Sequence, residues 1–266
     1  MISVAFILKF IVAAVGAGTP LLFGTVGEIM SEKVGHLNLG VEGMMAIGAV
    51  AGFAAGYATG NLAAAMAAAF LAGMLAALIY AVLTVGFMAN QNVIGLTLTI
   101  FGVGLSNFIG VYMIGKTDSN TWQLPAELIA QMKNVTIPVL SDIPVLGKLL
   151  FNYDPFTYVG IVIALLCGWY LFRTKTGLNV QAIGENPSAA DAASIQVTKW
   201  KYINILLGGG ICGIGGAYCS MVINGGVWIS DCVGGLGWIS VALVIFAAWR
   251  PQVAILGSFV FGALRI

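Results

Sequence analysis

A stretch that could do chemistry is GVYMIGKT, Gly110 to Thr117, which fits the nucleotide-binding pattern G-x-x-x-x-G-K-[ST] in full. A phosphate-binding loop works because backbone amides that follow a strand surround the phosphates at the start of a helix. Here the intervening residues are bulky, the match ends an apolar run, and TDSNTWQLP after it is typical of a loop. We therefore expect no nucleotide at this stretch; if the system uses ATP, another subunit binds it.

A second polar cluster, residues 27–45, reads GEIMSEKVGHLNLGVEGMM between apolar runs. Asn38 and Glu42 are four residues apart, so they share one face if a helix resumes there. Ionisable groups at membrane depth usually face a cavity or the bundle interior and mark a pathway. We therefore expect Asn38 and Glu42 to lie near a translocation path. The preceding charges are expected to be solvated in a short cytoplasmic turn, namely Glu28, Glu32 and Lys33.

Histidine and cysteine are sparse. His36 is the only histidine and has no partner at metal-ligand spacing, so we expect it to be solvated or hydrogen-bonded. Cys167, Cys212 and Cys219 sit in apolar runs, where cysteine behaves as a small hydrophobe. Cys212 and Cys219 are seven apart, but no histidine or carboxylate neighbours them at ligand spacing. We expect no metal and no catalytic residue, which disfavours a membrane enzyme or redox subunit.

The amino-acid composition indicates what kind of protein holds these residues in place. The 266 residues are 60% hydrophobic and 8% charged, with a mean hydropathy of +1.00, whereas soluble domains carry about 25% charged residues. The sequence therefore predicts a polytopic membrane protein. A net charge of +1 supports no argument for nucleic acid or an acidic substrate.

Six apolar segments are long enough to cross a bilayer, for which about 17–25 residues are needed. They lie near residues 3–27, 39–59, 62–87, 93–115, 155–172 and 202–223. Two shorter runs, near 236–248 and 252–264, predict a half-helix pair or a broken hairpin, tolerated where protein or a cavity covers the backbone. We expect an all-α membrane helical bundle of about eight membrane segments, forming one domain over 1–266. The chain stops inside an apolar segment, so we expect a truncated C-terminus.

Small residues follow a helical spacing. Gly48, Gly52, Gly56 and Gly60 recur at every fourth position, which places them on one face of a helix. Small residues let helices approach closely in lipid, where packing replaces the hydrophobic effect. We expect this stripe, and the glycines at 208–216, to serve helix packing.

A polar island, residues 172–201, interrupts the apolar sequence with FRTKTGLNVQAIGENPSAADAASIQVTKWK. The island is net positive, whereas the other long polar stretch, 116–154, is slightly acidic; the positive-inside rule puts the island in the cytoplasm and 116–154 outside. Glu185-Asn186-Pro187 favours a turn, and Ser188 to Ala193 favours a short helix. Such a helix between two spans predicts a docking element for a cytoplasmic partner.

Three stretches resemble permease subunits of bacterial ABC importers of the branched-chain amino acid and simple-sugar class. They are GHLNLGVEGMMAIGA (35–49), AIGENPSAADAASIQVTKWKY (182–202) and GLGWISVALVIFAAWRPQVAILGSFVFG (235–262). Within that class the chain is most similar to the permeases paired with basic-membrane-lipoprotein-type binding proteins, which take up nucleosides and related compounds.

The resemblance implies a type II importer-like fold in the bacterial cytoplasmic membrane. It implies as partners an ABC ATPase subunit that binds ATP and Mg²⁺, a second permease chain that is a homologue or a copy of this one, and an extracytoplasmic substrate-binding lipoprotein, all acting at the lipid bilayer. It implies no cofactor in this chain. The cytoplasmic coupling loop would be residues 173–201. Its contacts with the ATPase would be made by Gly184, Glu185, Asn186, Pro187, Ala189, Ala190 and Asp191.

The chain departs from the family pattern in places. The family commonly has glycine where this chain has Ser194, often has Arg-Gly where this chain has Leu236-Gly237, and often has Gly-Arg-Trp-Asn-Pro around Trp249-Arg250-Pro251. These departures affect the prediction of the transported solute more than the prediction of the transporter class. Among the candidate solutes we rank nucleosides first, purine-like or flavin-like compounds and simple sugars second, and branched-chain amino acids last. The alternative function is an ion-coupled secondary transporter of a small polar solute, for which Glu42 is the only good buried carboxylate.

Overall fold

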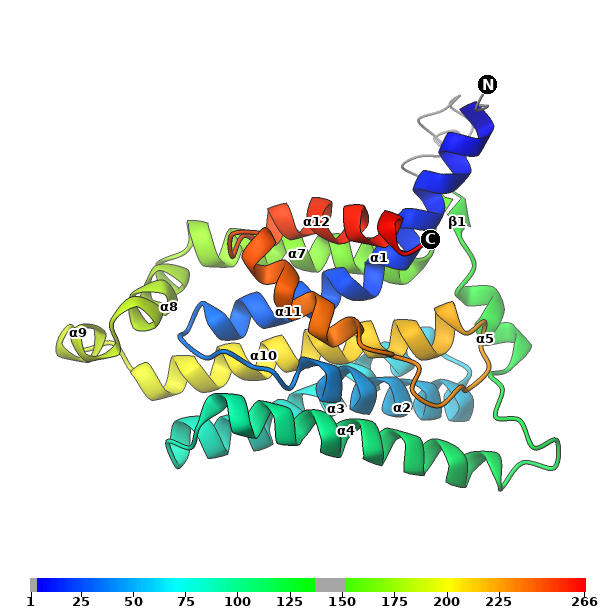
Figure 1. Ribbon diagram of the computed structural model, residues 1–266, viewed down its shortest axis with the longest axis horizontal. Helices are drawn as coiled ribbons and strands as arrows, with labels where there is room; N and C mark the ends of the chain where they lie inside the picture. Colours follow the sequence, from blue (N-terminus) through cyan, green and yellow to red (C-terminus); the bar gives the residue numbers. More distant parts are fainter. Residues whose placement is uncertain (1–3, 137–151) are drawn as a thin grey trace.

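The protein is described by a computed structural model that covers residues 4–136 and 152–266 (Figure 1). The long helices are α1 (Val4–Glu32), α2 (Val41–Thr59), α3 (Leu62–Ala81), α4 (Gln91–Ile114), α7 (Pro155–Arg173) and α10 (Val197–Tyr218). The shorter helices are α5 (Ala126–Gln131), α8 (Lys175–Glu185), α9 (Pro187–Ala192), α11 (Leu236–Phe246) and α12 (Pro251–Leu264). The π-helical turns η1 (Val82–Gly86) and η2 (Cys219–Ile223) extend α3 and α10, and the two-residue strands β1 (Val135–Thr136) and β2 (Asn152–Tyr153) pair antiparallel.

Side-chain caps fix where several of the spanning helices begin. Asn61 accepts hydrogen bonds from the amides of Ala63 and Ala64 at the start of α3. Asn90 does the same for α4, and the carboxylate of Asp154 accepts from the amide of Thr157 in α7. Caps of this kind satisfy amides that have no partner inside the helix.

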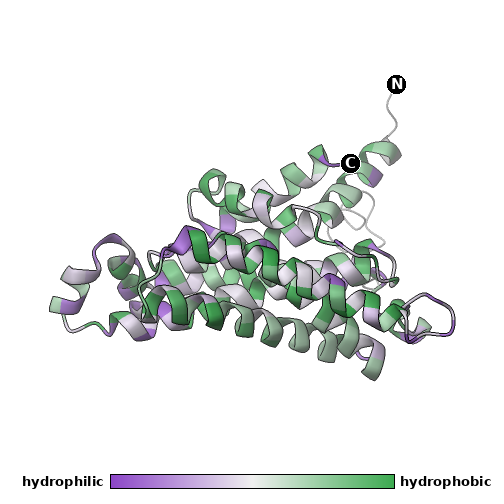
Figure 2. Cartoon of the chain, turned by 60° about the horizontal axis from the view of Figure 1, so that its bottom comes forward, coloured by the Kyte–Doolittle hydropathy of each residue, from purple (hydrophilic) through white to green (hydrophobic). Residues whose placement is uncertain are grey.

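The fold class predicted from the sequence is confirmed. Among the residues that the structure describes, six helical segments are long and apolar enough to cross a membrane, and α11 and α12 are the two shorter apolar helices. In Figure 1, α8 and α9 lie at one end of the bundle, and α5 lies at the opposite end. Polar residues gather at these two ends, and apolar residues dominate the helices between them (Figure 2). The polar island and the 116–136 segment therefore lie on opposite sides, as the charge bias requires.

The centre of the bundle is a close packing of α2, α3 and α10. A Cβ atom added to Gly48 would collide with the backbone of Gly213, and one added to Gly73 would collide with the carbonyl of Gly209. Gly52 and Gly56 also face this contact. Small residues thus let the three helices approach to backbone contact, as the spacing predicts.

Gly60 is an exception to the predicted stripe. It lies beyond α2, has a φ of 63°, and its amide donates to the carbonyl of Gly56 as the helix ends. A Cβ atom there would meet nothing within 4 Å. Gly60 therefore ends α2 by adopting a left-handed conformation and does not pack against another helix.

The glycine contacts predict opposite effects for two alanine substitutions. Gly216→Ala in α10 would push its methyl group into the main-chain carbonyl of Met45, which cannot rotate away, so we expect the free energy of unfolding to fall by about 2 kcal/mol. Gly104→Ala in α4 meets nothing within 4 Å and is expected to be neutral or stabilising by up to about 1 kcal/mol. Thermal unfolding of the purified protein in detergent measures both. Equal melting temperatures for the two variants would contradict this packing.

Two non-helical segments run into the bundle from opposite ends. Residues 33–40 join α1 to α2 from the α8 end, and residues 224–235 join η2 to α11 from the other end (Figure 1). The expected pair of short helices, α11 and α12, follows the second segment. Irregular backbone at membrane depth requires hydrogen-bond partners from the protein, and the side chains that supply them are described below.

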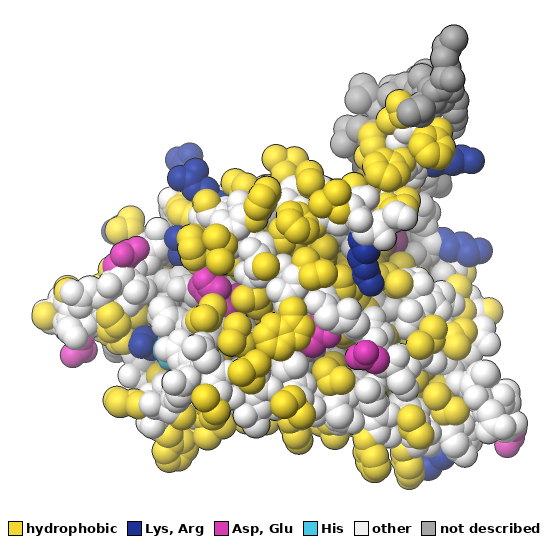
Figure 3. Space-filling view, viewed as in Figure 1, with side chains coloured by type: hydrophobic (Ala, Val, Ile, Leu, Met, Phe, Trp, Pro, Cys, Tyr) yellow, Lys and Arg dark blue, Asp and Glu magenta, His cyan; other side chains and the backbone are white. Residues whose placement is uncertain are grey.

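Much of the surface is apolar. Hydrophobic side chains are spread over the whole face seen in Figure 3, and acidic and basic side chains are confined to a few places on it. Exposed apolar residues on α4 include Ile100 and Phe108, at 77% and 70% exposure. Such a surface suits contact with lipid or with another membrane subunit.

Candidate functional site

The polar island folds into two helices joined by a one-residue turn. Asn186 ends α8 and caps α9: its side-chain oxygen accepts from the amide of Ala189 at 3.0 Å. Pro187 occupies the first position of α9, where its missing N–H costs nothing. The predicted turn and short helix are therefore present, and the α8–α9 unit protrudes at the end of the bundle (Figure 1).

Helix α8 was not predicted from the sequence. The hydroxyl of Thr174 accepts from the amide of Gly177 at 3.0 Å and starts the helix. Gly177, Val180 and Ile183 are buried on one face. Their spacing of three residues is the signal for an amphipathic helix, but it is short and lies among polar residues.

The coupling residues carried over from the family resemblance divide by exposure. Ala190 is 3% exposed and packs into the hydrophobic core, and Gly184 is partly buried. The other five are exposed and form a free surface, namely Glu185, Asn186, Pro187, Ala189 and Asp191. The unit is thus held on one side and open on the other.

The α8–α9 unit touches the segment that follows α1. A Cβ atom on Gly184 would lie 2.5 Å from the carbonyl oxygen of Lys33, and a Cβ atom on Gly35 would lie 3.4 Å from the Cα of Gly184. The side-chain amide of Gln181 donates to the carbonyl of Leu171 in α7 at 2.6 Å. Movement of α8 would therefore be carried to α7 and to the 33–40 segment by direct contact.

Ser194 has a φ of 62°, in the left-handed region, and its amide donates to the carbonyl of Asp191 at 2.8 Å. Glycine adopts this conformation without the steric cost that a side chain brings. The turn is thus one that glycine would form without steric cost, and Ser194 forms it in this chain.

Asn38 is 1% exposed and closes a turn before α2. Its side-chain oxygen accepts from the backbone amide of Gly40 at 2.9 Å, and its backbone N–H donates to the Glu28 carboxylate at 2.7 Å. Helix α2 resumes only at Val41, so Asn38 and Glu42 do not share a helix face, and that part of the expectation is wrong. The local bond between Asn38 and Gly40 competes with helix formation and delays it.

Other side chains satisfy the rest of the 33–40 segment. The hydroxyl of Tyr80 donates to the carbonyl of Leu37 at 2.7 Å, and that of Thr99 donates to the carbonyl of Leu39 at 2.9 Å. The side-chain oxygen of Gln91 accepts from the amide of Leu37 at 2.9 Å. The segment is therefore fixed by polar groups of α3 and α4.

Glu42 links the two non-helical segments of the bundle, residues 33–40 and 224–235. One carboxylate oxygen accepts from the amide of Gly235 at 2.8 Å, and the other accepts from the amide of Gly237 at 2.6 Å. Both amides lie at the start of α11, where a negative charge also suits the helix dipole. The Glu42 side chain is 4% exposed, so it holds α2 against α11 within this chain.

Of the three charges expected to be solvated before Asn38, Glu28 is buried, whereas Glu32 and Lys33 are half-buried, so the expectation is wrong for Glu28. Helix α1 continues to Glu32, and Glu28 is 0% exposed. Glu32 accepts from the indole N–H of Trp249, in the turn between α11 and α12. Burial lowers the pKa of Lys33, which lies over the ring of Phe172.

His36 is 2% exposed, and within the described residues neither ring nitrogen has a hydrogen-bond partner. The expectation of a solvated or hydrogen-bonded histidine is therefore wrong. Burial lowers the pKa of His36 to about 4, and the nearby Lys201 ammonium adds to the effect. The side chain is thus neutral at physiological pH.

The burial of His36 predicts loss of stability in acid. Because its pKa falls from 6.5 to about 4 on folding, the unfolded chain binds a proton below pH 6.5 that the folded chain does not. Between about pH 7.5 and pH 5 this lowers the free energy of unfolding by about 2 kcal/mol. Thermal unfolding in detergent at both pH values, compared with His36→Leu, measures the effect. An equal acid-induced drop in the variant would show that His36 is not the source.

The GVYMIGKT stretch lies at the carboxyl end of α4. Lys116 lies over the ring of Tyr112 with its ammonium 4.5 Å from the centroid, and the hydroxyl of Thr117 donates to the carbonyl of Ile114. Carbonyl groups, which repel anions, end a helix on this side. The segment has no strand before it and no helix start after it to surround a phosphate.

The fold and these contacts define a class: a multi-pass helical membrane protein with interrupted helices and a protruding helical unit at one end. The chain belongs to the family described as branched-chain amino acid transport system / permease component, whose model matches residues 10–266.

Curated relatives agree with this family. TsgC13 of Haloferax volcanii, provisionally named a glucose ABC transporter permease protein, is 33% identical over 95% of this chain and 74% of its own length. The nucleoside ABC transporter permease protein NupC of Lactococcus lactis is 34% identical over 92% of this chain and 77% of its own length. The guanosine ABC transporter permease protein NupQ of Bacillus subtilis is 32% identical over 91% and 76%.

The family confirms the function expected from the resemblance. The chain is a permease subunit of an ABC transporter in the cell membrane. The findings do not support the ion-coupled alternative, for which Glu42 was the candidate carboxylate; that carboxylate accepts hydrogen bonds from two backbone amides.

Proposed function

We propose that this chain is the non-catalytic permease subunit of an importer for nucleosides or related purine-like solutes. The main support for this proposal is the contact of the α8–α9 unit with the 33–40 segment. This contact connects an exposed docking surface to the non-helical segment between α1 and α2. ATP and Mg²⁺ are bound by a separate ATPase subunit that docks on residues 184–191. Closure of that ATPase moves α8 and, through Gly184 and Lys33, the interrupted helices.

Asn38 and Glu42 belong to the translocation path as positioning residues. Asn38 fixes the segment that enters from the cytoplasmic side, and Glu42 fixes the start of α11, which follows the segment from the external side. The solute passes near the place where the 33–40 segment and the start of α11 meet. The path is completed by a second permease chain, either a homologue or a copy of this one.

The solute class is supported by the names of the relatives NupC and NupQ, which give nucleosides and guanosine. The name of TsgC13 favours glucose as the second candidate. An extracytoplasmic binding protein delivers the solute and sets the specificity, since tight binding in the permease itself would slow release.

Ligand identification on the cognate binding protein tests the solute. The protein is purified from cells that express the whole transporter, and bound small molecules are identified by mass spectrometry and confirmed by calorimetry. We expect a nucleoside to bind at least about a hundredfold more tightly than glucose, a difference near 3 kcal/mol. Preferential binding of glucose or of a branched-chain amino acid would overturn the nucleoside assignment.

A further inference from the structure

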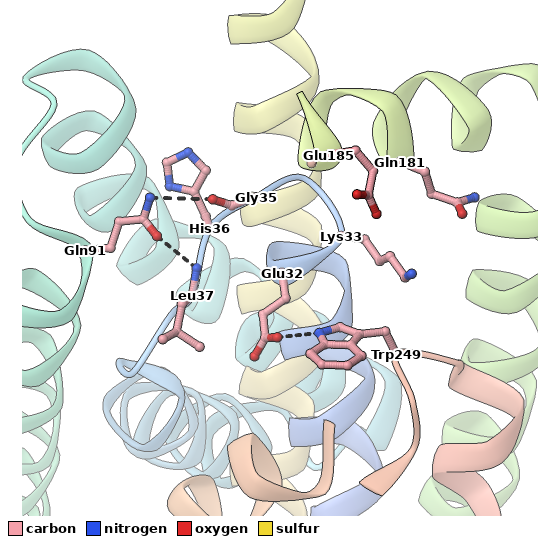
Figure 4. A pocket seen from close by; sticks show the side chains of 10 residues that line it. Glu32, Lys33, Gly35, His36, Leu37, Gln91, Gln181, Glu185 and Trp249 are labelled. Atoms are coloured by element: carbon pink, nitrogen blue, oxygen red, sulfur yellow. Dashed lines mark hydrogen bonds between the residues drawn. The ribbon is translucent and has the colours of Figure 1, made fainter. Parts of the chain in front are cut away.

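A polar pocket of about 480 Å³ lies at the cytoplasmic end of the chain, beside the coupling contact, with which it shares Lys33, Gly184 and Glu185. Its walls come from the end of α1 and the segment after it, from α8, from the start of α4, and from the turn between α11 and α12 (Figure 4). Side chains that line it include Glu32, Lys33, His36, Gln181, Glu185 and Trp249.

Opposite charges face this pocket without forming an ion pair. Lys33 and Glu185 attract one another electrostatically, yet among the described residues no ion pair or hydrogen bond joins them. Figure 4 shows both side chains directed toward the same space beside α8. The pocket therefore offers a hydrogen-bond donor and an acceptor on neighbouring walls.

Trp249 supplies a flat wall in a fixed position. The carboxylate of Glu32 accepts from its indole N–H. Trp249 and the preceding Ala248 both have left-handed backbones, with φ of 53° and 49°. Non-glycine residues adopt this conformation at a steric cost, and such strain gathers at ligand sites and switch regions.

His36 is a second, independent sign of a ligand. The side chain lines the pocket, is 2% exposed, and has no hydrogen-bond partner at either ring nitrogen within the described residues. Buried polar groups are normally paired, and an unpaired one calls for a partner that the protein itself does not supply. A neutral imidazole offers one donor and one acceptor.

We propose that this pocket binds a neutral purine base or nucleoside from the cytoplasm. The carbonyl oxygen of a purine lactam edge accepts from the Lys33 ammonium, its adjacent N–H groups donate to the Glu185 carboxylate, and the ring lies against Trp249. A phosphate is disfavoured because the carboxylates of Glu32 and Glu185 line the same space. A sugar lacks the flat ring, so it leaves the indole face unused.

Occupancy of the pocket would slow import. A ligand held between α8, the end of α1 and the α11–α12 turn ties together elements that move relative to one another during coupling. Solute that accumulates in the cytoplasm would therefore inhibit its own uptake. This inference rests on the proposed function for the solute class, because the ligand is the class of compound that the transporter delivers.

Guanosine binding to the purified transporter in lipid nanodiscs, without the binding protein, tests the site. We expect Lys33→Met and Glu185→Gln each to weaken guanosine binding about tenfold. Trp249→Phe should retain binding but lose the ligand-induced change in indole fluorescence. Lys175→Met, on α8 but outside the pocket, should bind guanosine as the wild type does. Glucose and a branched-chain amino acid serve as ligand controls.

Three outcomes would overturn the site: no guanosine binding by the wild type, guanosine binding by both pocket variants that is as tight as that of the wild type, or preference for the amino acid. Delivery of guanosine by the binding protein, measured as uptake by the same transporter in proteoliposomes, separates the two proposals. If the binding protein delivers guanosine but the complex alone does not bind it, the pocket inference fails and the proposed function stands. If the pocket variants weaken guanosine binding while the binding protein takes no nucleoside, the solute assignment fails and the site stands.

Discussion

Asn186→Ala combined with Pro187→Gly is expected to lower solute uptake about tenfold while the permease still inserts into the membrane. The Asn186 side chain caps α9, and Pro187 fixes its first residue. Loss of the cap costs about 1 kcal/mol and added chain flexibility costs a similar amount, which together reduce the folded docking helix about tenfold or more. A six-residue helix is too short to be stable by itself, so it depends on this cap together with the packing of Ala190.

The measurement is uptake together with stimulation of the ATPase by the loaded binding protein. The matched control is Asn61→Ala, which removes a cap of the same chemistry from α3 at the opposite end of the bundle. We expect the control to keep ATP hydrolysis coupled to uptake. If the double variant keeps both uptake and ATPase stimulation at wild-type levels, residues 184–191 do not form the coupling element.

Glu42→Ala is expected to abolish uptake and to destabilise the permease by about 3 kcal/mol. The change leaves the amides of Gly235 and Gly237 without their acceptors in a buried position, and an unsatisfied buried group costs about 1–3 kcal/mol. Glu42→Gln is expected to have a smaller effect in the same direction, because one amide then faces an NH₂ group. Uptake assays and thermal unfolding in detergent measure the two effects.

The Glu42 variants also separate a structural role from ion coupling. A carboxylate that carries an ion would lose uptake on substitution by glutamine with the melting temperature unchanged. A carboxylate that holds α11 loses stability and uptake together. Glu127→Gln, at an exposed position on α5, is the matched control and should change neither quantity.

The spans could be predicted closely because length and hydropathy alone define them. The span expected near 93–115 is α4, Gln91–Ile114, and the two short apolar runs are α11 and α12. The prediction failed where a hydrogen bond to a residue outside the local helix pattern determines whether a charged side chain is buried. Glu28 was predicted to be solvated because it is charged, but its carboxylate accepts from the amide of Asn38, and α1 continues through it.

The candidate site could be predicted only in part, for the same reason. The turn at Asn186-Pro187 is local and was predictable from its residue types. The bonds from Glu42 to Gly235 and Gly237 join residues more than 190 positions apart, and no pattern around Glu42 indicates them. The role of Trp249 was also missed, because its position depends on a left-handed turn in residues that rarely adopt one.

We infer that uptake is driven by an ATPase acting through the α8–α9 unit. The most direct measurement is nucleoside uptake into proteoliposomes that contain this permease with its ATPase and permease partners, with the loaded binding protein outside. We expect uptake to require ATP inside the vesicles, on the side of α8 and α9, and to persist when ionophores remove all ion gradients. Uptake that follows an ion gradient in the absence of ATP would contradict the account.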